Sequence, residues 1–133
     1  MAHANTKPKV LVVDDEHAIA DSLAMILNQH GFESTPLYSG EEAVDWVAKA
    51  TPDILVSDIA MGPMDGINAA IRIRELRPEC RIILFSASMI DTPTCARLVT
   101  LGFEFLKKPL HPLFLLEQLA AGQPVDGQVK ARC

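Results

Sequence analysis

The sequence predicts an α/β fold, in which a parallel sheet is covered by helices on both faces. Three short apolar runs rich in β-branched residues, at residues 10–13, 53–57 and 81–85, are typical of strands buried on both faces. Segments with helical spacing separate these runs, and such alternation predicts parallel βαβ units. Because the chain has 133 residues, close to the ~150 that is usual for one domain, we expect one main core.

Helix boundaries are marked by local signals. The first expected helix carries apolar residues at i, i+4, i+7 and i+8 from Ile19 and ends before Gly31. The second follows Ser39, which has Glu42 at the spacing of a capping box. The remaining helices are expected at about residues 65–77, 93–102 and 112–121.

Two further strands and the chain ends have weaker signals. Residues 32–38 alternate weakly and contain Pro36, which places any strand there at a sheet edge. Residues 103–106 are expected to form a last short strand. We expect residues 1–8 to be a loose leader, residues 9–121 the folded domain, and residues 122–133 a tail or the start of a linker.

Composition and charge exclude several classes of protein. Twelve Lys and Arg against 17 Asp and Glu give a net charge of −5, which disfavours binding to nucleic acid or an anionic membrane surface. No apolar run approaches the ~18 residues of a membrane span. The three cysteines, at positions 80, 95 and 133, show no CxxC spacing, which fits reduced thiols and a cytoplasmic location.

Polar side chains stand directly after the expected strands. They are Asp14 and Asp15, Asp58, Ser86, and Lys107 with Lys108. In an open parallel sheet, ligands bind outside the carboxyl ends of the strands. The sequence therefore predicts that carboxylates, a hydroxyl and an ammonium meet at one edge of the sheet.

This set of groups is suited to phosphoryl transfer. Neighbouring carboxylates repel one another, and an all-oxygen set without His or Cys selects a hard cation such as Mg²⁺. We therefore expect His17, beside the acidic residues, to be solvated and not a ligand. A Lys supplies charge for phosphate oxygens, and a free carboxylate can attack phosphorus to give an acyl phosphate.

With these motifs in order, the chain resembles the receiver domains of two-component response regulators from Lys9 to about Ala121. The motifs are Val-Val-Asp-Asp-Glu at 12–16, Asp-Ile-Ala-Met at 58–61, Met-Asp-Gly at 64–66, Ser-Ala at 86–87 and Lys-Pro at 108–109. The resemblance implies a flavodoxin-like sheet of order 2-1-3-4-5. That order places the strand containing Pro36 at an edge.

The resemblance also implies roles for single residues. Asp58 is the expected phosphoacceptor. Asp15 is the expected direct Mg²⁺ ligand, Asp14 acts largely through water, and the main-chain carbonyl of Ala60 supplies a further ligand. Such a domain is not an enzyme with turnover, although it assists its own phosphorylation and dephosphorylation.

The remaining roles concern switching. Ser86 is the expected switch hydroxyl, Phe105 falls at the position of the switch aromatic, and Lys108 is the lysine that joins the site. The bond from Lys108 to Pro109 is expected to be cis.

The chain departs from the family pattern in the loop after Asp58. Proline stands one place later than usual, in Gly62-Pro63-Met64, so the loop beside the metal can differ in backbone dihedrals. Ala60 replaces a frequently polar side chain, which bears on the lifetime of the acyl phosphate. Phe105 lacks a hydroxyl, so switching there uses packing.

The implied partners are a histidine kinase or phosphotransfer protein and an unidentified output partner. Leu113-Phe114-Leu115-Leu116 is apolar around much of the last helix, which favours a partner or homodimer surface formed by the last two helices and the last strand. Three alternatives remain: a pseudo-receiver that acts without phosphorylation, a hydrolase with an Asp nucleophile, and a flavin-binding electron carrier. Ala60 disfavours the hydrolase, and the acidic residues after the first strand disfavour a flavin phosphate.

Overall fold

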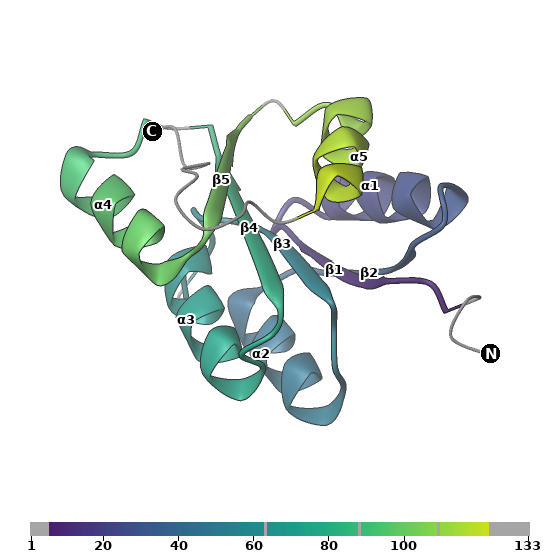
Figure 1. Ribbon diagram of the computed structural model, residues 1–133, viewed down its shortest axis with the longest axis horizontal. Coiled ribbons are helices and arrows are strands. Elements are labelled where there is room, and N and C mark those ends of the chain that lie inside the picture. Colours follow the sequence, from purple (N-terminus) through teal and green to yellow (C-terminus); the bar gives the residue numbers. More distant parts are fainter. Residues whose placement is uncertain (1–5, 63, 88, 109, 123–133) are drawn as a thin grey trace.

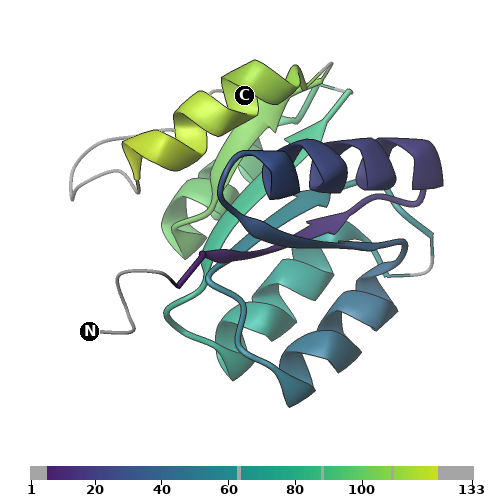
Figure 2. The same cartoon turned by 90° about the vertical axis from the view of Figure 1, so that its right-hand side faces the viewer.

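A computed structural model describes residues 6–62, 64–87, 89–108 and 110–122. Within them a parallel five-stranded sheet lies between two layers of helices (Figures 1 and 2). The strands are β1 (Lys9–Val13), β2 (Glu33–Leu37), β3 (Ile54–Asp58), β4 (Arg81–Ser86) and β5 (Glu104–Lys107). The helices are α1 (His17–Gln29), α2 (Gly40–Lys49), α3 (Gly66–Leu76), α4 (Thr92–Leu101) and α5 (Pro112–Ala121).

The strand order is β2-β1-β3-β4-β5, which confirms the predicted fold. β2 is an edge strand, and Pro36 stands there opposite Val12 of β1. Proline is tolerated at that position because an edge strand has one side that needs no ladder hydrogen bonds. The last strand starts at Glu104 and not at residue 103, because the Phe103 N–H closes the end of α4 by donating to Leu98 O at 3.0 Å.

Alternate residues of each strand enter two separate cores. Leu11 and Val13 belong to the core beneath α2, α3 and α4, whereas Val10 and Val12 face the core beneath α1 and α5. Figure 2 shows these two helix layers on opposite sides of the sheet. Because successive side chains of a strand point to opposite faces, continuous apolar runs are what a sheet covered on both faces requires.

Three helices begin with a Ser or Asp cap, and the capping-box spacing predicted the one at Ser39. The Ser39 hydroxyl accepts from the Glu42 N–H at 3.1 Å, and the Asp65 and Asp91 carboxylates accept from the third residue beyond each at 2.8 Å. These bonds satisfy orphan N–H groups of the first turn. The end of α4 uses Gly102 with φ of 77°, a left-handed conformation that glycine adopts without strain.

A buried ion pair fastens α5 to the amino-terminal edge of the sheet. The Arg81 guanidinium contacts both Glu104 carboxylate oxygens, at 2.7 and 2.8 Å, and each side chain is below 10% exposed. The same guanidinium donates to the Gln118 carbonyl at 3.1 Å. Arg81 therefore joins β4, β5 and the last turn of α5.

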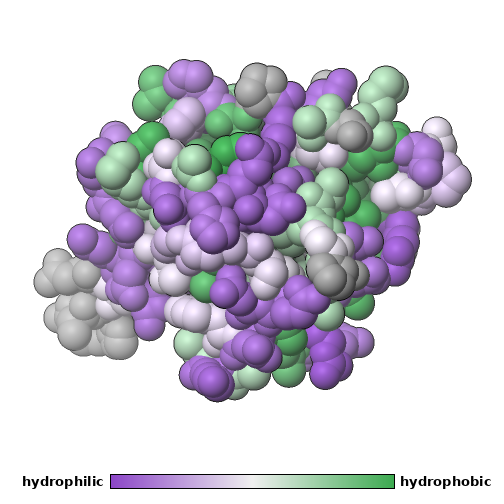
Figure 3. Space-filling model, turned by 180° about the vertical axis from the view of Figure 1, so that it is seen from behind, coloured by the Kyte–Doolittle hydropathy of each residue, from purple (hydrophilic) through white to green (hydrophobic). Residues whose placement is uncertain are grey.

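The apolar run of α5 is divided between the core and the surface. Leu115 is fully buried, whereas Leu113 and Phe114 are 61% and 43% exposed. On the face seen in Figure 3, hydrophilic residues predominate and apolar side chains form separate patches. No helix within the described ranges is both long and apolar enough to cross a membrane.

The expectation of a reduced thiol is confirmed for Cys80. Cys80 is a free, buried thiol, and burial raises its pKa to about 11. Cys133 lies outside the described residues.

Candidate functional site

Four polar residues lie where strands end at the carboxyl edge of the sheet. Asp14 follows β1, Asp58 and Ser86 are the last residues of β3 and β4, and Lys108 follows β5. Strand pairing sets their spacing, since Val13 pairs with Ser57, Asp58 with Phe85, and Ser86 with Lys107. Residues distant in sequence are therefore neighbours at this edge.

Three carboxylates come together at this edge. Asp14, Asp15 and Asp58 each offer an oxygen, and these oxygens lie within 4.8 Å of one another. Asp14 is fully buried, Asp58 is 5% exposed, and Asp15 is exposed to solvent. The three residues form a cluster of hard oxygen ligands with one open side, which is a suitable donor set for a divalent cation.

Lys108 bridges the two buried carboxylates. Its ammonium lies 3.1 Å from Asp58 Oδ2 and 3.3 Å from Asp14 Oδ2. The ammonium also lies 5.2 Å from the centroid of the Phe85 ring, a favourable position for a cation over an aromatic face. Lys107, the preceding residue, is exposed. Of the two adjacent lysines, Lys108 is therefore the one that reaches the cluster.

The pKa values reflect this arrangement. Burial raises the pKa of Asp14, and the hydrogen bond from the Glu16 N–H and the charge of Lys108 offset this only in part. Burial by itself lowers the pKa of Lys108, but the hydrogen bond to Asp58 and the charges of both carboxylates outweigh it, so the net shift is upward. The Lys108 ammonium therefore stays protonated at neutral pH.

The loop after β3 packs tightly against Asp58. The Ala60 N–H donates to Asp58 Oδ1 at 3.3 Å, and the Gly66 N–H donates to the Ile59 carbonyl at 2.7 Å. A β-carbon at Gly66 would lie 2.0 Å from the Asp58 carbonyl oxygen. Gly66 therefore lets the start of α3 approach the backbone of Asp58. Pro63, which marks the departure from the family pattern, lies outside the described residues.

Ser86 and Phe105 are both buried, at 4% exposure each. The Ser86 carbonyl accepts the Lys108 N–H at 3.0 Å, so the two residues are joined through the backbone. Phe105 pairs with Leu84 across the sheet and lies in the core beneath α4. The aromatic ring is thus directed inward in this structure. The expected cis bond after Lys108 involves Pro109, which lies outside the described residues.

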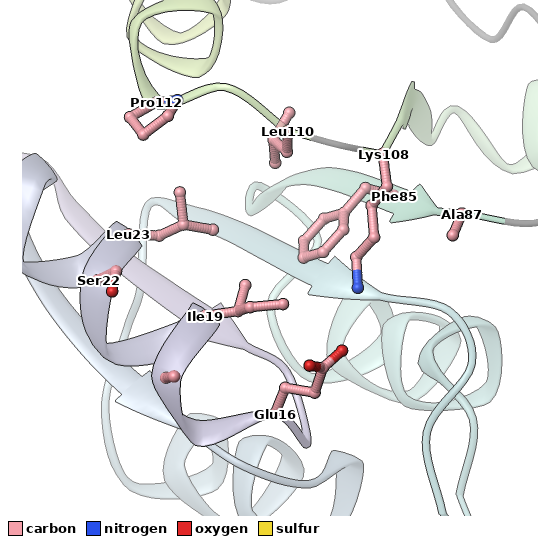
Figure 4. Close-up of a pocket in the computed structure, with 10 residues that line it drawn as sticks. Glu16, Ile19, Ser22, Leu23, Phe85, Ala87, Lys108, Leu110 and Pro112 are labelled. Atoms are coloured by element: carbon pink, nitrogen blue, oxygen red, sulfur yellow. The ribbon is translucent and has the colours of Figure 1, made fainter.

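A cavity of about 680 Å³ opens beside the cluster (Figure 4). Ile19 and Leu23 line it from α1, and Leu110 and Pro112 line it at the start of α5. In Figure 4 the Lys108 side chain passes the Phe85 ring and extends toward the side of the cavity where Glu16 lies. The carboxylate cluster is therefore adjacent to a mainly apolar groove between α1 and α5.

Sequence reasoning assigned no role to Gly66 or Phe85. Gly66 was visible in the Met-Asp-Gly motif, but its close approach to Asp58 requires the three-dimensional arrangement. Phe85 was counted as part of a buried strand. His17 is exposed as expected and does not belong to the carboxylate cluster, although its ring stacks on Tyr38.

The fold and the site together place this chain among α/β domains that have a parallel sheet and, at its carboxyl edge, an acidic cluster bridged by a lysine. Comparison with known proteins identifies the family. The sequence matches the response regulator receiver domain over residues 10–120. It is 32% identical over 113 residues to the response regulator MprA of Mycobacterium avium, a match that covers 85% of this chain and 48% of the relative. MprA of Mycobacterium tuberculosis gives the same identity over 113 residues, with 85% and 47% covered.

Solved structures agree with this assignment. A CheY-like receiver domain from Methanospirillum hungatei has a TM-score of 0.81 and 24% identity, covering 87% of this chain and 93% of that one. Chemotaxis response regulator CheY4 of Vibrio cholerae has a TM-score of 0.76 and 28% identity, with 87% and 98% covered. The chain belongs to the response regulator receiver domain family of two-component systems. It spans about half the length of the curated relatives it matches.

Proposed function

We propose that this receiver domain accepts a phosphoryl group on Asp58 in the presence of Mg²⁺. The observation that carries the proposal is the Lys108 ammonium, which lies 3.1 Å from Asp58 and 3.3 Å from Asp14 within a cluster of three carboxylates. An ammonium at this place neutralises negative charge on a transferring phosphoryl group. The same ammonium orients one oxygen of Asp58.

Accessibility favours Asp58 over Asp14 as the nucleophile. Each of the two carboxylates accepts one backbone N–H and contacts Lys108, but Asp14 is fully buried whereas Asp58 is 5% exposed. Asp58 ends its strand beside the open side of the cluster. One of its oxygens attacks phosphorus, a new O–P bond forms, and the bond between phosphorus and the donor nitrogen breaks. The electron pair of that bond stays on the donor nitrogen.

The metal proposal follows from the donor set. Asp15 would bind Mg²⁺ directly, Asp14 largely through water, and Asp58 with the Ala60 carbonyl would complete the protein ligands. Hard oxygen donors without histidine or cysteine are the ligands that Mg²⁺ prefers. The bound ion would supply positive charge opposite the phosphoryl oxygens. Burial raises the pKa of Asp14, and a cation would favour its ionised form.

The response to phosphorylation is proposed to pass through Ser86 and Phe105 to the surface formed by α4, β5 and α5. Leu113 and Phe114, which are exposed on α5, lie on the helix that contributes to this surface. A phosphoryl group shifts an equilibrium between two states of such a domain. A beryllofluoride-activated receiver of NtrC4, 29% identical to this chain with a TM-score of 0.76, is a dimer, and a homodimer or an output partner is proposed here.

The proposed donor is a histidine kinase or a phosphotransfer protein. A cytoplasmic location is part of the proposal, because such a kinase draws on ATP. The domain would assist its own phosphorylation and dephosphorylation without turning over an external substrate. Ala60 offers no carboxyl group as a general acid, which argues against a hydrolase with an Asp nucleophile.

Intact-protein mass spectrometry tests the acceptor. The chain is incubated with phosphoramidate and Mg²⁺, beside Asp58→Asn, a chelator control, and the matched control Asp45→Asn, which alters an exposed carboxylate on α2. One phosphoryl addition is expected in the wild-type chain and in Asp45→Asn. It should be absent from Asp58→Asn and with chelator. Addition that persists in Asp58→Asn would overturn the assignment, and its absence from all samples together with absent Mg²⁺ binding would favour the pseudo-receiver.

A further inference from the structure

The segment that carries the acidic pair leads into a helix without a side-chain cap. Glu16, the N-cap of α1, makes no capping hydrogen bond, whereas Ser39, Asp65 and Asp91 each cap their own helices. An uncapped first turn leaves N–H groups without intrahelical partners. Apart from the hydrogen bond from the Glu16 N–H to Asp14 Oδ1 at 2.9 Å, the loop with Asp15 takes its support from another part of the molecule.

That support comes from the residues that end β2. The Asp14 N–H donates to the Leu37 carbonyl at 3.1 Å. Three residues later, the His17 ring stacks on the Tyr38 ring, with centroids 3.8 Å apart and planes 22° from parallel. Leu37 and Tyr38 thus hold both ends of the loop, and Asp15 lies between the two attachments.

Tyr38 is itself fixed at two points. Its hydroxyl donates to Asp21 Oδ1 at 2.6 Å, one turn of α1 beyond His17. The hydrogen bond to Asp21 raises the pKa of Tyr38, so the hydroxyl keeps its proton at neutral pH. The Tyr38 N–H donates to Glu42 Oε1 at 2.8 Å. Tyr38 therefore connects the start of α2, through its main-chain N–H, with the first turns of α1, through its ring and hydroxyl.

We infer that Tyr38 is a positioning residue for the metal-ligating pair Asp14 and Asp15. The inference rests on the proposed Mg²⁺ site. Asp15 is exposed and its conformation depends on the loop, so loss of the ring would let the loop populate arrangements that do not bind the metal. Apparent affinity falls in proportion to the fraction of molecules in the competent arrangement. A stacked aromatic pair of usual strength corresponds to a loss of about two- to tenfold.

Two measurements on the full chain test the role of Tyr38. Isothermal titration with Mg²⁺ gives the dissociation constant, and amide hydrogen exchange without metal reports the order of residues 14–17. The variants are Tyr38→Leu, which removes the ring, and Tyr38→Phe, which keeps the ring but removes the bond to Asp21. Phe32→Leu is the matched control, because Phe32 packs on the same core from the opposite end of β2.

The expected result is a two- to tenfold weaker Mg²⁺ affinity in Tyr38→Leu, about as estimated for one aromatic stack, with faster exchange at residues 14–17. Tyr38→Phe should restore most of the affinity, and Phe32→Leu should leave it unchanged while lowering global stability. His17→Leu combined with Tyr38→Leu should add no further loss, since both remove the same contact. Unchanged affinity and exchange in Tyr38→Leu would overturn the inference. If the wild-type chain binds no Mg²⁺, the metal proposal fails, and the exchange data alone then decide the role of Tyr38.

Discussion

The close contact between Gly66 and Asp58 gives a quantitative prediction. In Gly66→Ala, the new β-carbon would lie 2.0 Å from the Asp58 carbonyl oxygen and 2.9 Å from Ile59 Cα. Real β-carbons essentially never approach closer than 3.0 Å, so the two backbone segments must separate by about 1 Å. Both neighbours are main-chain atoms, and no flexible side chain can relieve the overlap.

A displacement of this size affects both rate and stability. A misplacement of about 1 Å at a reacting group costs about a hundredfold in rate, so the initial rate of phosphorylation by phosphoramidate should fall by about that factor. Overpacking at a close contact lowers the free energy of unfolding by about 1–3 kcal/mol. Alanine is a better helix former than glycine, so helix propensity works against the expected loss. Intact mass over time gives the rate, and urea unfolding gives the stability.

Gly62→Ala and Gly40→Ala are the comparison variants. Among the described residues, a β-carbon at Gly62 meets no atom within 4 Å, and the φ of Gly62 is not positive, so the rate should stay within about twofold of the wild-type chain. A β-carbon at Gly40 lies 2.9 Å from the Met64 carbonyl oxygen, and an intermediate effect is expected. If Gly66→Ala matches Gly62→Ala in both rate and unfolding free energy, the reasoning from the close contact is wrong.

Two further predictions concern buried groups away from the cluster. Arg81→Met should lower the free energy of unfolding by about 3–5 kcal/mol, because it leaves the buried Glu104 carboxylate unpaired. Adding Glu104→Leu to Arg81→Met should recover much of that loss. Equal losses in the single and double variants would contradict this prediction. The pKa of Cys80 is raised from 9.0 to about 11 in the folded chain, so its contribution to stability is full below pH 9 and is lost as pH rises toward 11. Between pH 9 and 11 the free energy of unfolding should fall by roughly 3 kcal/mol more in the wild-type chain than in Cys80→Ala. Urea titration at each pH measures this difference. Parallel pH profiles for the two chains would refute the prediction.

The pattern of apolar residues along the sequence predicted the sheet well, because both faces of the sheet are buried. Strands that must be apolar on both sides are visible as unbroken runs, as at Val10 to Val13, and Pro36 correctly indicated an edge strand. Parallel strands end at a common edge, so the polar residues that follow them could be placed together without coordinates. The strand pattern by itself therefore predicted that Asp14, Asp15, Asp58 and a lysine lie at one edge of the sheet, but not which of Lys107 and Lys108 reaches the carboxylates.

Contacts between distant segments could not be predicted in the same way. Lys108 and Asp14 are 94 residues apart, and nothing local to either residue states that one ammonium reaches two carboxylates. The stacking of His17 on Tyr38 depends on how the ends of β1 and β2 leave the sheet. The close approach of Gly66 to Asp58 likewise depends on how the start of α3 packs against the end of β3. Periodicity carries no information on such paths, because it describes only one element at a time.

The contacts of Lys108 with Asp14 and Asp58 suggest how phosphorylation of Asp58 would change the structure around the site. One ammonium compensates two buried carboxylates while Asp58 is unmodified. A phosphoryl group on Asp58 would bring new anionic oxygens, and the ammonium would then be shared differently between Asp14 and those oxygens. The Lys108 N–H is bonded to the Ser86 carbonyl at 3.0 Å, so a shift of the lysine backbone acts directly on the end of β4. On the proposed function, charge at Asp58 and the position of Ser86 would therefore be coupled through Lys108, the residue that follows β5.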